Sequence, residues 1–230
     1  MRNILKEQLK KCMYGAINWP IENKETYREF KTMQEAEKWG MKYYKDWADA
    51  YQNTMRQAET TIKDPLFAAT IECYCGYMYK TINNYLRNEI DNEKNFYREM
   101  ADIMTIVLCS APRIPENIVL YRLVDNEFVN ELIERNKETK HTPIKENGFM
   151  STSLLKDIVY VDESYACYNN LLKIYVESGT MGVYVNAITR RREEEILLFP
   201  GMYLGLANYP YRDESISKMV YECKLFNFKF

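Results

Sequence analysis

The hydrophobic pattern of this 230-residue chain changes its period near Pro115. Before that point, apolar and aromatic residues recur at steps of three and four, for example at Tyr27, Phe30, Met33 and Ala36, which places them on one face of a helix. After it come short runs rich in β-branched and aromatic residues, separated by turn signals such as Glu-Asn-Gly and Pro-Gly. Helices followed by strands predict an α+β fold in which the strands pair mainly antiparallel.

This pattern divides one expected domain, residues 1–230, into a helical lobe (1–112) and a β-rich core (113–230). The expected helices cover residues 26–51, 66–86, 95–110 and 125–135. The expected strands cover residues 118–122, 148–153, 171–176, 183–186, 196–199, 202–206 and 219–230.

Charge and hydropathy exclude several classes of function. The net charge of −2 and the isoelectric point of about 5.7 argue against bulk electrostatic binding to nucleic acid or to an anionic membrane. No run of about 20 apolar residues is present, so no membrane span is expected. The first eleven residues are amphipathic and of mixed charge, and no secretory signal is visible in them.

The cysteines and the single histidine limit metal and nucleophile chemistry. The six cysteines lack zinc-site spacing, so we expect free thiols and no metal site. His141, in a charged loop, is the only histidine available to activate a serine or cysteine nucleophile, and we interpret it as a solvated loop residue. Neither glycine-rich nucleotide-binding motif, Rossmann or P-loop, occurs.

Two carboxylates, Glu193 and Glu195, lie two residues apart at the start of an apolar run. In an extended strand, residues i and i+2 point to the same face. Taken alone, this spacing is more typical of a solvated strand edge. Two upstream segments change that interpretation: an apolar run that ends in Arg122, and a β-prone run that carries three consecutive hydroxyls, Ser151, Thr152 and Ser153.

In this chain order the three motifs resemble the Arg/Ser-Thr-Ser/Glu-x-Glu class of mono-ADP-ribosyltransferases, the class of the bacterial actin-modifying toxins. Residues 74–87 resemble the helix that packs over the nicotinamide in those toxins, with Tyr74, Tyr79, Asn83 and then Leu86-Arg87. Residues 35–47 resemble the N-terminal helical lobe of the iota-type and insecticidal toxins. The resemblance covers roughly residues 28–228. It implies NAD as co-substrate and a helical lobe packed on a two-sheet, antiparallel-rich catalytic core.

The resemblance implies catalytic roles for four residues. Glu195 is the expected catalytic carboxylate, which binds the ribose 2′-hydroxyl and stabilises an oxocarbenium-like transition state. Glu193 is expected to orient and activate the acceptor, and Ser151 to orient Glu195. Arg122 is expected to bind the NAD diphosphate, because a planar cation with several donors fits phosphate oxygens.

The resemblance also implies further NAD-binding residues. The backbone of Leu123 is expected to hold the nicotinamide carboxamide, and Tyr74, Tyr79 and Asn83 to cover the nicotinamide. The remaining expected members of the NAD site are Tyr121, Phe149, Thr152 and Ser153.

Three departures from the family pattern affect these expectations. The loop before the glutamates contains Arg190-Arg191-Arg192 in place of an aromatic residue, which suits either a solvated turn or an acidic target surface. Gly148 replaces an asparagine of the family. No clear equivalent of a second NAD-binding arginine is present, and Lys156 or Lys173 are weak substitutes.

Three functions stay open at the level of sequence. The leading one is transfer of ADP-ribose from NAD to an arginine of a target protein, because relatives that modify asparagine carry Gln at the position of Glu193. Actin is the expected target by resemblance to the iota-type toxins. The alternatives are an NAD glycohydrolase and a non-catalytic docking copy of the fold in a binary toxin.

Partners and location follow from the same resemblance. We expect a protein target with an exposed arginine, a possible separate delivery or binding component, and neither nucleic acid nor membrane as a partner. A toxin, effector or phage enzyme of this kind is expected to be secreted or delivered into a host cell and to act in the cytosol, or to act inside the producing cell.

Overall fold

The computed structural model describes residues 2–61, 70–88, 96–138, 142–160, 167–191 and 193–226. Its α-helices are α1 (Arg2–Tyr14), α2 (Met33–Thr61), α4 (Thr70–Cys73), α5 (Tyr79–Asn88), α6 (Phe96–Cys109), α7 (Asn126–Lys137) and α8 (Asn186–Thr189). A π-helix, η2 (Tyr74–Met78), joins α4 to α5, and two 3₁₀ turns are η1 (Lys24–Thr26) and η3 (Lys156–Tyr160).

The described strands form one hydrogen-bonded sheet of nine strands. They are β1 (Ile118–Val124), β2 (Ile144–Glu146), β3 (Met150–Ser153), β4 (Asn170–Val176), β5 (Gly182–Tyr184), β6 (Glu195–Leu198), β7 (Met202–Leu206), β8 (Tyr211–Asp213) and β9 (Lys218–Phe226). The order is β2-β7-β9-β4-β1-β3-β6-β5, with β8 on β9. Among these strands only β4 and β9 pair in parallel, so the predicted α+β class and its antiparallel bias are confirmed.

The sheet is weakly joined at its centre. In the described part of the chain, β1 and β3 share a single residue pair, Tyr121↔Ser153, whereas β1 pairs with β4 along its whole length from Ile118 to Val124. The two predicted sheets are therefore present as two half-sheets, one from β2 to β1 and one from β3 to β5, and this junction links them. The candidate site lies at this junction.

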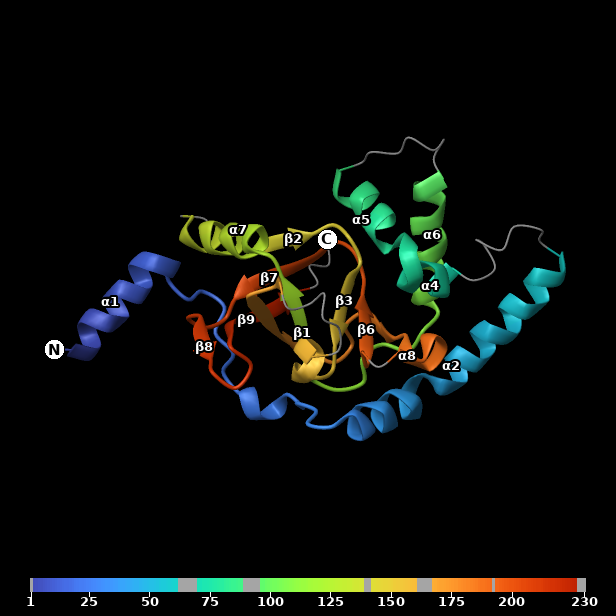
Figure 1. The fold of residues 1–230 in the computed structure, drawn as a ribbon, viewed down its shortest axis with the longest axis horizontal. Helices are drawn as coiled ribbons and strands as arrows, with labels where there is room; N and C mark the ends of the chain where they lie inside the picture. Colours follow the sequence, from blue (N-terminus) through green and yellow to red (C-terminus); the bar gives the residue numbers. More distant parts are fainter. Residues whose placement is uncertain are drawn as a thin grey trace.

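Most of the described helices gather at one end of the sheet (Figure 1). Figure 1 shows α4, α5, α6 and α8 gathered beside β3 and β6, with α2 running along the same end of the molecule. Helix α1 lies at the opposite end, near α7, where Asn136 Nδ2 donates to Ala16 O at 2.9 Å. The ring of Trp19 packs on Phe226 with centroids 4.8 Å apart. The N-terminal segment therefore supports the far half-sheet and not the site.

Helix α2 starts later than predicted. Glu35 N donates to Thr32 Oγ1, which caps the helix, and the preceding residues are extended, with Arg28 bridged to Ile118. Gly40 lets α2 approach the sheet closely, because a Cβ atom there would lie 2.2 Å from the ring of Tyr184. None of the helices in the described ranges is long and apolar enough to cross a membrane.

Candidate active site

A pocket of about 360 Å³ opens at the junction of the half-sheets. Its walls come from the π-helix and α5, from β1 and β3, and from the loop that leads into β6. The lining residues are Tyr74, Cys75, Gly76, Tyr79, Asn83, Tyr121, Arg122, Leu123, Ser151, Thr152, Ser153, Ile158, Tyr168, Arg191, Glu193 and Glu195. Every predicted site residue except Phe149 is among them, so segments far apart in sequence meet at one cavity.

Glu195 lies at the buried floor of this pocket. Ser151 Oγ donates a hydrogen bond to Glu195 Oε1, and Glu195 Oε2 is buried without a hydrogen-bond partner among the described residues. Burial raises the pKa of Glu195 to about 7, and the charge of Glu193 adds to the rise. The Ser151 hydrogen bond and the cations Arg191 and Arg122 oppose it. An unpartnered carboxylate oxygen facing a pocket can accept a hydrogen bond from a ligand hydroxyl.

The raised pKa of Glu195 predicts a pH profile. The ionised carboxylate is the form that can stabilise a cation, so activity is lost as pH falls through about 7. Below that inflection, kcat/KM for NAD is expected to rise about tenfold per unit of pH, because one proton must leave. Steady-state rates of NAD turnover across pH measure this. In Ser151→Ala the inflection is expected at higher pH, since a bond that favours the ionised form is gone. An inflection at the ordinary value of 4.5 would contradict the effect of burial.

The three hydroxyls of β3 bind three different groups of the glutamate segment. Besides the Ser151 bond to Glu195, Thr152 Oγ1 donates to Ile196 O and Ser153 Oγ donates to Glu193 O, both at 2.7 Å. Thr152 and Ser153 were predicted to bind NAD. Both line the pocket, but their hydroxyls are engaged in fixing β6 and the turn before it.

The turn before β6 is held by residues that the sequence pattern did not identify. Glu195 N donates to Asn186 Oδ1 at 3.2 Å, and Asn186 Nδ2 donates to Arg191 O. Glu194 has a left-handed backbone (φ 47°) and accepts from the Tyr184 hydroxyl, outside the pocket. Burial raises the pKa of Glu194. Glu193 and Glu195 lie on the pocket side and Glu194 lies in the interior, through the left-handed turn at Glu194 and not through the alternation of an extended strand, since β6 begins only at Glu195.

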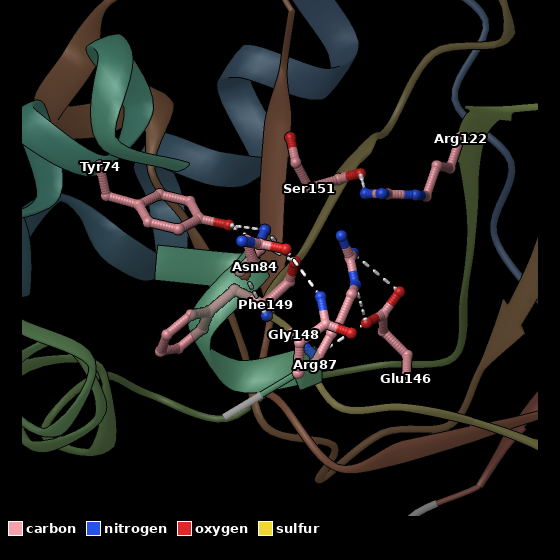
Figure 2. A network of polar contacts seen from close by, with 10 residues as sticks. Tyr74, Asn84, Arg87, Arg122, Glu146, Gly148, Phe149 and Ser151 are labelled. Atoms are coloured by element: carbon pink, nitrogen blue, oxygen red, sulfur yellow. Dashed lines mark hydrogen bonds and ion pairs between the residues drawn. The ribbon is translucent and has the colours of Figure 1, made fainter. Parts of the chain in front are cut away.

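A second network fixes the helical wall to β3. Figure 2 shows the rings of Tyr74 and Phe149 close together beside this contact, with their centroids 5.5 Å apart. Asn83 Nδ2 donates to Phe149 O at 3.1 Å and to the Tyr74 hydroxyl at 2.9 Å, and Phe149 N donates to Asn83 Oδ1 at 2.8 Å. A Cβ atom at residue 148 would lie 2.9 Å from Asn83 Oδ1, which explains the glycine there.

Two residues expected to contact NAD, Asn83 and Phe149, take part in this network. The ring of Phe149, the residue before β3, is fully buried in the main core against Tyr74 and Phe199, and Phe149 is not among the described residues that line the pocket. Both the Nδ2 and the Oδ1 atom of Asn83 form hydrogen bonds with other groups of the chain. Tyr79 is exposed at the pocket rim, and a π-helix at such a wall is a frequent feature of functional sites.

Arg122 crosses the junction between the half-sheets. Its Nη1 donates to Ser151 O at 2.8 Å, and burial lowers its pKa from the ordinary value of 12.5. Arg87 lies beyond it, where Nε and Nη2 bind Glu146 at 2.8 and 3.0 Å (Figure 2). This bidentate pair ties α5 to β2, and the sequence did not predict it.

The lysines considered as a second NAD-binding cation lie elsewhere. Lys156 binds Asp213 at 2.6 Å and Lys173 binds Glu29 at 3.0 Å, and neither is among the described residues that line the pocket. Glu29 also accepts from the Tyr121 hydroxyl, which therefore points away from the site although Tyr121 forms part of its wall. Arg191, from the arginine loop, does line the pocket.

Other predictions concern cysteines, metal ligands and His141. The six cysteines are all free thiols, as expected. Within the described residues, no group of three His, Cys, Asp or Glu side chains is arranged to hold a metal ion. His141 and Arg192 lie outside the described residues.

Solved structures with the same fold are bacterial toxins and exoenzymes. The chain resembles BECa, an ADP-ribosylating toxin of a C. perfringens binary enterotoxin solved with NADH (21% identity, 87% of this chain and 50% of BECa, TM-score 0.66). It also resembles Plx2a, an ADP-ribosyltransferase toxin from Paenibacillus larvae (20% identity, 86% and 99%, TM-score 0.62). C3stau2 from S. aureus, solved with NAD, is a third (17% identity, 88% and 99%, TM-score 0.60). The chain spans about half the length of BECa.

Comparison of the sequence with known proteins shows the family of this chain. No curated protein matches the chain. A family model described as ADP-ribosyltransferase exoenzyme matches residues 36–207, which include most of the helical wall, β1, β3 and the glutamate segment. The chain belongs to this ADP-ribosyltransferase exoenzyme family.

Proposed function

We propose that this chain transfers ADP-ribose from NAD to an arginine side chain of a target protein. The observation that carries the proposal is the convergence of Arg122, Ser151, Glu193 and Glu195 on one pocket, with Ser151 bonded to Glu195. Family membership supports the transferase chemistry. The NADH and NAD in the structures of BECa and C3stau2 support NAD as the co-substrate.

Glu195 provides the main electrostatic stabilisation of the transition state in the proposed reaction. Cleavage of the bond between nicotinamide and ribose leaves positive charge on the ribose, and nicotinamide departs as a neutral molecule, so no strong general acid is required. A buried carboxylate that faces this charge stabilises the transition state more than it stabilises NAD, and a preorganised charge needs no reorganisation during the reaction. Ser151 holds the carboxylate in place. Arg122, half-buried beside them, is suited to the diphosphate.

Glu193 supports an arginine acceptor. A guanidinium is cationic at neutral pH and is a poor nucleophile until it loses a proton. Glu193 lies at the pocket, two residues from Glu195, where a carboxylate can pair with a guanidinium and draw off that proton.

The proposed target and delivery route follow from resemblance to known toxins. We take actin as the first target to test, on the resemblance to iota-type toxins. A separate delivery component is supported by BECa, which belongs to a binary enterotoxin. In this proposal residues 1–230 act as one domain in the cytosol of a host cell after secretion or delivery.

Labelled NAD tests the proposed function. The purified chain is incubated with NAD and agmatine, a small guanidine, and then with a eukaryotic lysate and with purified actin. We expect labelled agmatine and one labelled protein band. Free nicotinamide with no labelled acceptor would instead indicate a glycohydrolase. No turnover of NAD would indicate a docking copy of the fold.

A further inference from the structure

An arginine of the chain itself lies beside the proposed acceptor carboxylate. Arg191 belongs to the loop between α8 and β6 and lines the pocket together with Glu193 and Glu195. Its Nη1 is 3.9 Å from Glu193 Oε2, and its side chain is 42% exposed, so the guanidinium is accessible at the pocket mouth. A guanidinium therefore already occupies the side of the pocket at which the external arginine is proposed to bind.

The backbone holds Arg191 in this position. Asn186 Nδ2 donates to Arg191 O, and Asn186 Oδ1 accepts from Glu195 N at 3.2 Å. One amide side chain thus fixes the carbonyl of Arg191 relative to the start of β6. The backbone of Arg191 is thereby held beside the pocket, which is the kind of proximity that raises the effective concentration of an intramolecular acceptor.

We propose that Arg191 is an internal acceptor, which the enzyme modifies with ADP-ribose from its own NAD. This inference rests on the proposed arginine transferase activity. A guanidino nitrogen of Arg191 attacks C1′ of the nicotinamide ribose, and the new C–N bond forms as the bond to nicotinamide breaks. Nicotinamide leaves with that electron pair, and the proton of the guanidinium passes to Glu193 and then to water. The products are ADP-ribosyl-arginine, nicotinamide and one proton.

The modification is expected to limit the enzyme. An ADP-ribosyl group on Arg191 places a bulky, doubly charged substituent at the acceptor side of the pocket, between Glu193 and any target arginine. Transfer to external acceptors therefore falls as Arg191 is modified. Arg191 thus competes with the target arginine for ADP-ribose. The modified fraction of the enzyme rises with the time that the enzyme spends with NAD in the absence of a target protein.

Arg190 provides the matched control. It is the adjacent arginine of the same loop, is exposed, and is not among the described residues that line the pocket. Its backbone is left-handed (φ 51°). Arg190→Lys and Arg191→Lys each remove one guanidinium and keep the charge, so only their positions relative to Glu193 differ.

The test is incubation of the purified chain with labelled NAD alone, followed by peptide mapping, beside a parallel reaction with agmatine. We expect one ADP-ribosyl group on Arg191, at a rate independent of protein concentration. The label should be lost in Arg191→Lys and kept in Arg190→Lys. Preincubation with NAD should reduce later transfer to agmatine in the wild type and in Arg190→Lys in proportion to the modified fraction, and should not do so in Arg191→Lys.

Failure of this inference is distinguishable from failure of the proposed function. Labelled agmatine with no label on Arg191 of the wild-type chain would overturn the internal acceptor and leave arginine transfer intact. A rate that rises with protein concentration would also overturn it, since it would indicate transfer between molecules. If neither agmatine nor the chain is labelled, arginine transfer itself fails and the internal acceptor fails with it.

Discussion

Glu195→Gln is expected to lower kcat by about 1000-fold, a loss of about 4 kcal/mol of transition-state stabilisation. Glutamine keeps the size of the side chain and can still accept from Ser151, but it brings no negative charge to the ribose. Because the carboxylate is buried, its charge is poorly screened by water and its removal has a large effect. Nicotinamide release and agmatine labelling should fall together, since both require the same cation.

The adjacent glutamate offers a control for Glu195→Gln. Glu194→Gln also neutralises a buried carboxylate one residue away, but that side chain binds the Tyr184 hydroxyl outside the pocket. Most of kcat should remain in Glu194→Gln, and NAD affinity measured by calorimetry should change little in Glu195→Gln. Equal losses of kcat in both variants would show that the effect comes from damage to β6 and not from a lost charge at the ribose.

Glu193→Gln is expected to separate transfer from hydrolysis. Loss of the proposed base should lower agmatine labelling by about 100-fold or more, the usual contribution of a positioned base. Nicotinamide release in the absence of agmatine should stay near the wild-type rate, because Glu195 and its bond from Ser151 are untouched. The two rates are measured in parallel reactions with the same enzyme preparation, so the ratio of transfer to hydrolysis is independent of protein concentration.

Either of two results would contradict this role of Glu193. If hydrolysis falls as much as transfer, Glu193 acts on the ribose or on the position of Glu195. If transfer persists, the acceptor does not need a base at this position. The bond from Ser153 Oγ to Glu193 O does not involve the side chain, so the substitution leaves this backbone contact in place.

The sequence predicted those parts of the fold that depend on local pattern. Residues 118–122 and 171–176 are apolar runs, and they form β1 and β4 at the centre of the sheet with one or two residues added at their ends. The α6 helix also matches its predicted range. The pocket could be predicted because the order of three motifs resembles a family, and the catalytic and binding roles assigned to its residues stay predictions.

The rest depends on tertiary contacts that no local pattern contains. The strands β2 and β8 are three residues each, too short for a periodic signal, and they exist because β7 and β9 offer them edges. Asn186 follows β5 and was expected to continue that strand, but it starts α8 and holds the turn before β6. Lys173 was considered for NAD because its charge is visible in the sequence, whereas its partner Glu29 lies 144 residues away.

The anchoring of the glutamate segment has a consequence for how enzymes of this shape can diversify. Asn186 ties the start of the arginine loop to Glu195, while the hydroxyls of Thr152 and Ser153 fix the strand that follows. A one-residue slip of β6 would turn Glu195 away from the pocket, so selection against insertions should be severe within the strand. The side chains of the loop can change in size and charge without displacing the carboxylate, because the groups that anchor the loop are the backbone carbonyls of Arg191 and Glu193. New targets can therefore be acquired by evolution in the loop while the chemistry is inherited unchanged.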